Sequence, residues 1–165
     1  DDKYCAGDPN PDFYYGLNVK LSYKNWDFGF NGHGSIGYKV FNDFASNHST
    51  AYFDVNAGNL PNFATAVKRT GFTQISGDYQ FFSDFYLENA SFFRMDDINL
   101  GYTFKDLGNW GGNIRVAASC QNVFVLTKYS GIDPEIKDNS GQIDGVDKTF
   151  WPRPRTYSVR VNINF

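Results

Sequence analysis

The sequence lacks the features that mark a membrane-spanning helix or a nucleic-acid-binding protein. No window contains the run of about 18 consecutive apolar residues that a transmembrane helix needs. The 15 Lys and Arg residues are outnumbered by 18 Asp and Glu, which gives a formal net charge of −3. Because the chain has no excess of basic residues, we expect no basic surface and no nucleic acid as a partner.

Residues that commonly carry catalysis are also scarce. The only histidines are His33 and His48, and no paired nucleophile accompanies either of them. The two cysteines are Cys5 and Cys120. A disulfide between them stays open, but Cys120 falls in an alternating segment, where an apolar role is the simpler interpretation. We therefore expect a protein that is not an enzyme and that uses no cofactor and no metal ion.

Aromatic residues, by contrast, are frequent. They make up 19% of the chain, as 17 Phe, 11 Tyr and 3 Trp, and there are 16 Gly. Membrane β-barrels place aromatic residues in two belts at the membrane interfaces. An aromatic-rich soluble β-sandwich would have a similar composition, so composition alone does not separate the two classes.

Five segments alternate apolar and polar residues with the period of two that predicts β-strands. They span residues 12–24, 26–39, 92–104, 113–126 and 156–165. They are 10 to 14 residues long, which covers the roughly ten residues that a tilted strand needs to cross a bilayer. The faces opposite the apolar ones carry polar residues that suit a wet lumen: Lys20, His33, Arg115, Gln121 and Arg160. The predicted fold class is all-β, as the C-terminal five antiparallel strands of a large transmembrane β-barrel.

The ends of the apolar faces carry aromatic side chains, as the belts of a barrel require. These are Phe13, Tyr15, Tyr23, Trp26, Tyr102, Phe104, Tyr157 and Phe165. A final alternating strand that stops at Phe165 also resembles the signal by which outer-membrane barrels are recognised for assembly. Five strands are too few to close a barrel, and an open set leaves unpaired backbone groups in lipid. We therefore expect the chain to be part of a larger one.

The connections between the strands alternate strictly in length. Asn25 joins the first two strands and residues 105–112 join the third and fourth, whereas residues 41–90 and 127–155 form long connections. Outer-membrane barrels keep short turns on the periplasmic side and long loops outside. The two long loops are therefore expected to be extracellular and the C-terminus periplasmic. A short helix is expected around residues 63–69.

Three stretches of sequence resemble one family of outer-membrane proteins. Residues 83–104, with Leu87-Glu88-Asn89-Ala90-Ser91 at their centre, are similar to a signature near the end of SusC/RagA-type TonB-dependent transporters. Residues 121–124 with 127–135 match the family's next block. Residues 151–158 match the block before its last strand, with Trp151 in the usual Tyr position. The three stretches occur in the family's order and cover most of residues 83–165.

The resemblance implies a barrel of 22 strands, closed by an N-terminal plug that this chain does not include. It also implies energy from the inner-membrane TonB complex and a SusD-like surface lipoprotein as a lid over the substrate. Such transporters import oligosaccharides or peptides across the bacterial outer membrane. The chain is then expected to contribute barrel wall and extracellular loops, in contact with outer-membrane lipid and with a glycan or peptide substrate.

Aromatic residues beside the strands are the candidates for substrate contact, because aromatic faces can stack on sugar rings. They are Phe81, Phe82, Tyr86, Tyr129 and Trp151. The simpler interpretation is that most of them form the outer belt and pack the loops together. Arg153 and Arg155, which alternate with prolines, are better interpreted as loop anchors than as a ligand clamp. Whether the acidic loop at residues 138–147 binds calcium stays open, because runs of Asp, Asn and Gly are also ordinary turn formers.

Two other function classes remain as alternatives. A soluble or surface β-domain that binds carbohydrate would explain the alternation and the aromatic residues, but not the loop order or the three family stretches. A barrel with a structural or adhesive role would lack the plug domain that a transporter must carry. Substrate identity and oligomeric state do not follow from the sequence.

Overall fold

The computed structural model describes residues 4–51, 65–73, 83–105, 111–135, 145–148 and 151–164. The chain divides into two compact units. The first, here called the sheet unit, comprises the described residues of Asp12–Ile36, Phe92–Thr127 and Pro152–Phe165. The second, here called the loop unit, comprises those of Asp1–Pro11, Gly37–Ser91 and Lys128–Trp151. Both long connections between strands therefore contribute to one and the same unit, together with the first residues of the chain.

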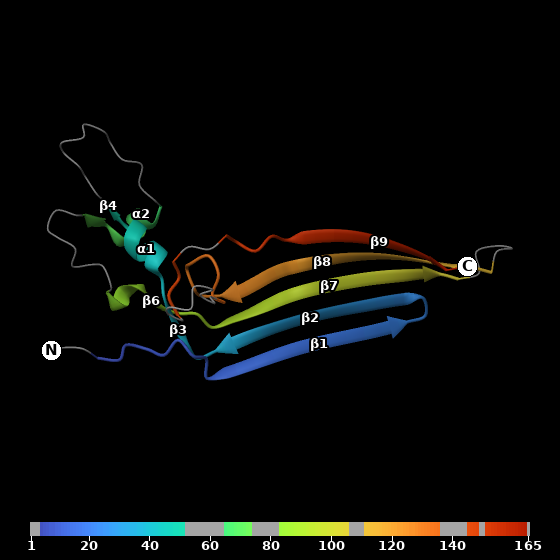
Figure 1. The fold of residues 1–165 in the computed structure, drawn as a ribbon, viewed down its shortest axis with the longest axis horizontal. Helices are drawn as coiled ribbons and strands as arrows, with labels where there is room; N and C mark the ends of the chain where they lie inside the picture. Colours follow the sequence, from blue (N-terminus) through green and yellow to red (C-terminus); the bar gives the residue numbers. More distant parts are fainter. Residues whose placement is uncertain are drawn as a thin grey trace, which may run out of the picture. The chain divides into compact units, whose positions relative to one another are not determined.

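The sheet unit is a five-stranded antiparallel sheet in the order β1-β2-β7-β8-β9, with the strands side by side in Figure 1. The strands are β1 (Phe13–Tyr23), β2 (Trp26–Ile36), β7 (Phe92–Phe104), β8 (Asn113–Thr127) and β9 (Thr156–Asn164). The predicted all-β fold is therefore confirmed, and the strands lie close to the segments expected. Neighbouring strands in the sheet follow the order of the sequence, as expected when antiparallel strands are joined by direct connections.

The register of the sheet sorts the side chains onto an apolar face and a polar face. One row across the sheet consists of Leu21, Phe28, Leu100, Ala118 and Val159. The adjacent row consists of Lys20, Gly29, Asn99, Ser119 and Ser158. Because successive residues of a strand point to opposite faces, these rows lie on opposite sides of the sheet. The apolar side chains are largely exposed: Val159, for example, is 76% exposed.

Aromatic rings gather toward both ends of this apolar face. Near the turn between β1 and β2, the rings of Trp26 and Tyr102 meet edge to face, with their centroids 4.7 Å apart. Toward the other end, Tyr15 stacks on Phe93 with a centroid distance of 6.1 Å. Tyr23 follows Tyr15 by eight positions in β1, or about 26 Å along the strand, which is close to the height of a barrel's apolar band. This spacing agrees with two aromatic belts, one toward each end of the apolar face.

Tyr157 and Phe165 were also expected in the belts. Tyr157 lies opposite Cys120, in the row of Ile98 and Phe30. Phe165 lies outside the described residues.

Two glycines let aromatic rings lie flat on the sheet. A Cβ atom on Gly34 would clash with the Tyr15 ring and with the Phe92 carbonyl oxygen. A Cβ atom on Gly32 would meet the Phe93 ring at 2.9 Å. The Tyr15 hydroxyl donates a hydrogen bond of 3.2 Å to the carbonyl of Phe92. The rings therefore cover backbone that the glycines leave bare, a known means of stabilising glycine in sheets.

The alternation in β7 changes phase at Asp96. Met95 pairs with Gly32 and Ile98 pairs with Phe30, so β7 contains one residue more than β2 between these two pairs. The extra residue is a β-bulge, which moves the apolar face from odd to even positions along β7. On the other side of β7, strand β8 contains one residue more than β7 between the pairs Met95–Phe124 and Asp97–Gln121. Asn122 lies in this irregular stretch and has a φ of +52°. The alternation from Ile98 onward could be predicted, but the bulge could not.

The second strand ends earlier than the expected residue 39. Gly37 has a φ of +86°, and its amide donates to the Ser91 hydroxyl. The chain therefore leaves the sheet after Ile36. Tyr38, expected on the apolar face of the strand, is instead buried in the loop unit, where its hydroxyl donates to the Pro134 carbonyl.

The loop unit contains short elements only. They are β3 (Lys39–Phe41), α1 (Asp43–His48), β4 (Thr50–Ala51), α2 (Ala66–Thr70), β5 (Phe72–Thr73), a 3-10 turn (Asp84–Tyr86) and β6 (Leu87–Asn89). Strand β3 pairs with β6, and β4 pairs with β5. Helix α2 lies near the helix expected at residues 63–69, but it begins three residues later. It is followed by Gly71, whose backbone is in the left-handed region. Among the described residues, no helix has both the length and the apolar character to span a bilayer.

Helix α1 was not expected from the sequence. The Asn42 side chain caps it by accepting a hydrogen bond of 2.9 Å from the amide of Ala45. Asp43 in its first turn and His48 in its last turn suit the helix dipole. With only six residues the helix is too short to show a periodic apolar stripe, so no periodic pattern predicts it.

Candidate functional site

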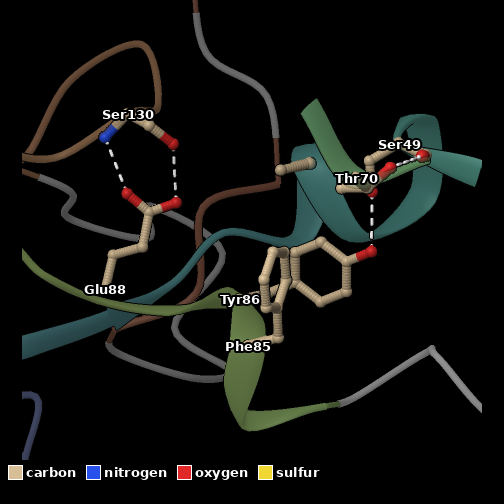
Figure 2. Close-up of a pocket in the computed structure, with 7 residues that line it drawn as sticks. Ser49, Thr70, Phe85, Tyr86, Glu88 and Ser130 are labelled. Atoms are coloured by element: carbon tan, nitrogen blue, oxygen red, sulfur yellow. Dashed lines mark hydrogen bonds between the residues drawn. The ribbon is translucent and has the colours of Figure 1, made fainter. Parts of the chain in front are cut away.

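A cavity of about 310 Å³ lies within the loop unit. Helix α1 contributes Ala45 to its lining, and the remaining lining residues are labelled in Figure 2: Ser49, Thr70, Phe85, Tyr86, Glu88 and Ser130. They come from four separate stretches of the chain. Of the three aromatic candidates for substrate contact that the structure describes, which are Tyr86, Tyr129 and Trp151, only Tyr86 is among them.

Tyr86 forms a fixed part of this cavity. Its side chain is 2% exposed, and its hydroxyl lies 2.6 Å from that of Ser49. Ser49 is itself buried, and its carbonyl oxygen accepts a hydrogen bond of 2.6 Å from the Thr70 hydroxyl. Figure 2 shows these two bonds on one side of the aromatic rings. Tyr86 is thus held by its neighbours rather than mobile at the surface.

Phe85 presents a ring to solvent. Its side chain is 59% exposed, and its ring meets that of Tyr86 edge to face at a centroid distance of 5.2 Å. The Ser83 hydroxyl caps the 3-10 turn by accepting a hydrogen bond from the Phe85 amide. Both the backbone and the ring of Phe85 are therefore positioned by contacts within the unit.

Glu88 joins the two long connections. Its carboxylate accepts hydrogen bonds from the Ser130 amide at 2.7 Å and the Ser130 hydroxyl at 2.6 Å. A third donor is the side-chain amide of Asn42, at 3.1 Å from Glu88 and 3.2 Å from the Ser130 hydroxyl oxygen. Hydrogen bonds to an ionised carboxylate are among the stronger ones in proteins. Glu88 belongs to the first family stretch and Ser130 to the second, so these two stretches meet here.

Tyr129 is buried in the loop unit beside Asp147. Its hydroxyl donates a hydrogen bond of 2.7 Å to the Asp147 carboxylate. Burial, followed by this hydrogen bond and the negative charge of Asp147, raises the pKa of Tyr129 well above its ordinary value. The tyrosine stays protonated at all physiological pH values. Its side chain packs the unit, as the simpler interpretation of the aromatic candidates expects.

The remaining aromatic candidates differ in position. Trp151 is 97% exposed and does not line the cavity. Phe81 and Phe82 lie outside the described residues, as do residues 138–144 of the acidic loop. In the part of the chain that the structure describes, no group of three or more His, Cys, Asp or Glu residues comes together as a metal site would require.

The five residues expected to line a lumen all lie on the polar face of the sheet. Arg115 donates a hydrogen bond of 2.9 Å to Asp27, whose carboxylate it contacts with two nitrogens. His33 Nδ1 lies 2.6 Å from an oxygen of Asp96. Lys20 pairs with Gly29 across β1 and β2, and the last two residues of the set are Gln121 and Arg160. The polar face thus carries charges of both signs, partly paired with one another.

Asn122 connects the three family stretches within the sheet unit. Its side-chain oxygen accepts a hydrogen bond of 3.0 Å from Arg94, a residue that is 3% exposed. Its side-chain amide donates to the Arg153 carbonyl at 2.7 Å. The Arg155 guanidinium donates to the Asn122 carbonyl at 3.3 Å. The Arg155 side chain therefore acts as an anchor, as expected, whereas Arg153 contributes its backbone carbonyl to these bonds. Together these contacts give the three stretches a structural reason to occur together.

Sequence similarity to known proteins extends over almost the whole chain. No family model matches the sequence. The chain is 37% identical over 99% of its length to the TonB-dependent receptor SusC of Bacteroides thetaiotaomicron. It is 30% identical, again over 99% of its length, to the TonB-dependent receptor P3 of Formosa agariphila. The chain spans 16% of the first relative and 17% of the second.

Solved structures show the same fold. A structure of the RagAB peptide importer in its open-open state matches with a TM-score of 0.67, at 20% identity and over 94% of this chain. A structure of the RagAB peptide transporter matches with a TM-score of 0.66, at 24% identity. Each match covers 17% of the solved chain. The resemblance of the three sequence stretches to this family is therefore confirmed by whole-length similarity. The chain belongs to the SusC/RagA family of TonB-dependent receptors, as a β-barrel segment.

Proposed function

We propose that this chain forms part of the barrel wall and the extracellular loops of an energy-coupled outer-membrane importer of oligosaccharides or peptides. The observation that carries the proposal is the apolar face of the five-stranded sheet, which is exposed and bordered by aromatic rings. Such a face suits contact with lipid, whereas a sheet in water would hide it. The 37% identity to SusC adds the receptor class.

The orientation follows from the connections. In the proposed arrangement the tight turn between β1 and β2 faces the periplasm, the loop unit lies outside the cell, and the C-terminus is periplasmic. The polar face with Lys20 and Arg160 lines the lumen of a larger barrel, which we take to have 22 strands. A SusD-like lipoprotein would cover the loops, and the TonB complex would act through other parts of the receptor.

The test is uptake by cells of the organism that encodes the chain. Cells with the intact gene and cells with the gene deleted receive fluorescently labelled oligosaccharides and peptides, with and without an uncoupler of the proton-motive force. We expect uptake of at least one of these two substrate classes to require both the gene and the proton-motive force. Uptake that is unaffected by the deletion for both classes, or that ignores the uncoupler, would refute the proposal.

A labelling control reports orientation in the same cells. The full-length receptor, with both native cysteines of this segment replaced by Ser, receives either Trp151→Cys in the loop unit or Lys24→Cys in the β1–β2 turn. A large polyethylene-glycol maleimide is expected to label the first variant on intact cells. The second should be labelled only after the outer membrane is opened. The reverse result would invert the proposed orientation.

A further inference from the structure

We propose that a groove on the apolar face of the sheet holds one acyl chain of an anionic phospholipid, with the lipid phosphate beside Lys24. This inference rests on the proposed function, because it takes the apolar face to meet the bilayer. A lipid held in this way differs from the fluid lipid around any barrel, since one molecule occupies one defined position on the barrel wall.

The groove has a volume of about 580 Å³ and lies on the three central strands of the sheet, β2, β7 and β8. Strands β1 and β9 lie beyond it on either side. Three of its apolar side chains are 45–48% exposed, so a ligand would cover a substantial apolar surface. The side chains that line it are those of Trp26, Leu100, Tyr102, Phe104, Val116 and Ala118.

A row of aromatic rings forms one wall of the groove. The Tyr102 ring meets Trp26 on one side and Phe104 on the other, edge to face, with 4.7 Å between the centroids in both pairs. Strand β8 presents the smaller side chains of Val116 and Ala118 next to this wall. The surface therefore steps down from β7 to β8, and a flexible apolar chain can lie along the step. Rings that their neighbours already hold lose little conformational freedom when a ligand packs against them.

The length and direction of the groove suit an acyl chain in one leaflet. Phe104 follows Leu100 by four positions in β7, or about 13 Å along the strand. Phe104 lies at the end of the sheet that holds the β1–β2 turn (Figure 1), where the Thr103 amide donates a hydrogen bond of 2.9 Å to the Asn25 carbonyl. The groove thus runs from one aromatic belt toward the middle of the apolar face. One leaflet contributes about half of the roughly 30 Å hydrocarbon core of a bilayer.

The belt end of the groove offers polar groups to a lipid head. The indole N–H of Trp26 and the hydroxyl of Tyr102 take part in none of the hydrogen bonds found among the described residues. The Lys24 ammonium lies 5.2 Å from the centroid of the Tyr23 ring, and Tyr23 pairs with Trp26 in the register. This cation–π contact holds the positive charge one strand away from Trp26, on the side of the sheet that carries the apolar face. A lysine at the membrane surface attracts an anionic lipid head.

These features together select a phospholipid over other apolar occupants. An extended polypeptide segment in the groove would bring backbone N–H and C=O groups into lipid, and the apolar lining offers them no partners. An acyl chain has no such groups to satisfy. A lipid without net charge would fill the groove equally well but would gain less from Lys24.

Native mass spectrometry of the purified full-length receptor tests this inference. The receptor is freed of its own lipids in detergent and is titrated with dioleoyl phosphatidylglycerol, dioleoyl phosphatidylcholine or glycerol 3-phosphate. We expect one phosphatidylglycerol per receptor to bind about fivefold more tightly than phosphatidylcholine, and glycerol 3-phosphate not to bind. Equal affinity for the two lipids, or binding of glycerol 3-phosphate at the same affinity as the lipid, would overturn the inference.

One variant tests the position of the acyl chain. Ala118→Phe fills the floor of the groove and should abolish the tight binding of phosphatidylglycerol. Its matched control is Leu21→Phe, which places the same ring in the same row of the apolar face but outside the groove. Both positions are exposed, so the unfolding temperature of the receptor should stay the same. Unchanged lipid affinity in Ala118→Phe would overturn the inference. So would a dimeric receptor that becomes monomeric in Ala118→Phe, because a second copy would then cover the groove.

A second variant tests the position of the phosphate. Lys24→Gln should weaken the binding of phosphatidylglycerol about fivefold, to the affinity of phosphatidylcholine. Lys20→Gln removes the same charge from the polar face and should leave the affinity unchanged; an equal loss in both variants would overturn the inference. A receptor that imports its substrate but holds no such lipid would overturn only this inference. Uptake that does not require the gene would overturn the proposed function.

Discussion

Asn122 combines two properties that few residues offer together. Its φ of +52° lies in the left-handed region, where Asn is tolerated better than most other residues. Its side chain also bonds two parts of the chain at once, through Arg94 on one side and the Arg153 carbonyl on the other. Glycine would satisfy the backbone but not the hydrogen bonds, and a larger amide would not satisfy the backbone.

Replacing Asn122 separates these two roles. Asn122→Ala should destabilise the receptor by about 2–4 kcal/mol, because it adds backbone strain to the loss of hydrogen bonds from the buried Arg94. Asn122→Gly, the matched control, should cost less by about 1–2 kcal/mol, since only the hydrogen bonds are lost. The measurement is the unfolding temperature of the purified full-length receptor in detergent. Equal temperatures for the two variants would show that the backbone conformation is not strained.

At the scale of strands, alternation was sufficient to predict most of the sheet. Val19, Leu21 and Phe28 lie on the apolar face as expected, because a period of two fixes the face of each residue once a strand is recognised. The bulge at Asp96 was not predicted, because a break in the alternation between Met95 and Ile98 looks the same whether a strand begins there or continues through a bulge. The end of β2 at Ile36 depends on the conformation of Gly37, which alternation does not report.

The cavity was harder to predict than the strands. Tyr86 was a candidate, but Glu88, Ser49, Thr70 and Ser130 were not considered as site residues. They are brought together by contacts between residues 21 to 42 positions apart, such as Thr70 with Ser49 and Glu88 with Ser130. Local sequence carries no signal for such pairings. Only the family resemblance of the stretches that hold Glu88 and Ser130 could have suggested that they meet.

The packing of aromatic rings over glycines gives a prediction for the sheet. Gly34→Ala should destabilise it by about 1–3 kcal/mol, because the added methyl group would clash with the Phe92 carbonyl and the Tyr15 ring. Gly16→Ala, also in a strand, is the control, since the nearest atom to its Cβ would be 4.0 Å away. The resistance of the detergent-purified receptor to heat unfolding on semi-native gels would compare them. Equal resistance would contradict the close contact at Gly34.

For the whole receptor, the division into two faces predicts where a charge is tolerated. Val159→Arg places a charge on the exposed apolar face and should cost about 2–4 kcal/mol if that face meets the middle of the bilayer. Ser158→Arg places the same charge on the polar face, one residue away, and should have little effect. The readout is the amount of folded full-length receptor in outer-membrane fractions. A greater loss for Ser158→Arg would mean that the faces are reversed.

The loop unit is assembled from both long connections, which sets a rule for building chimeras between receptors of this family. Glu88 comes from one connection and its partner Ser130 from the other, and Phe41 and Val146 pair across the same divide. A chimera that exchanges residues 41–90 alone would replace one partner of each of these contacts and keep the other. The two partners would then come from different receptors and would fit together only by chance. An exchange would therefore preserve the loop unit only if both connections were replaced together. The unit of exchange between such receptors is a pair of loops rather than a single loop.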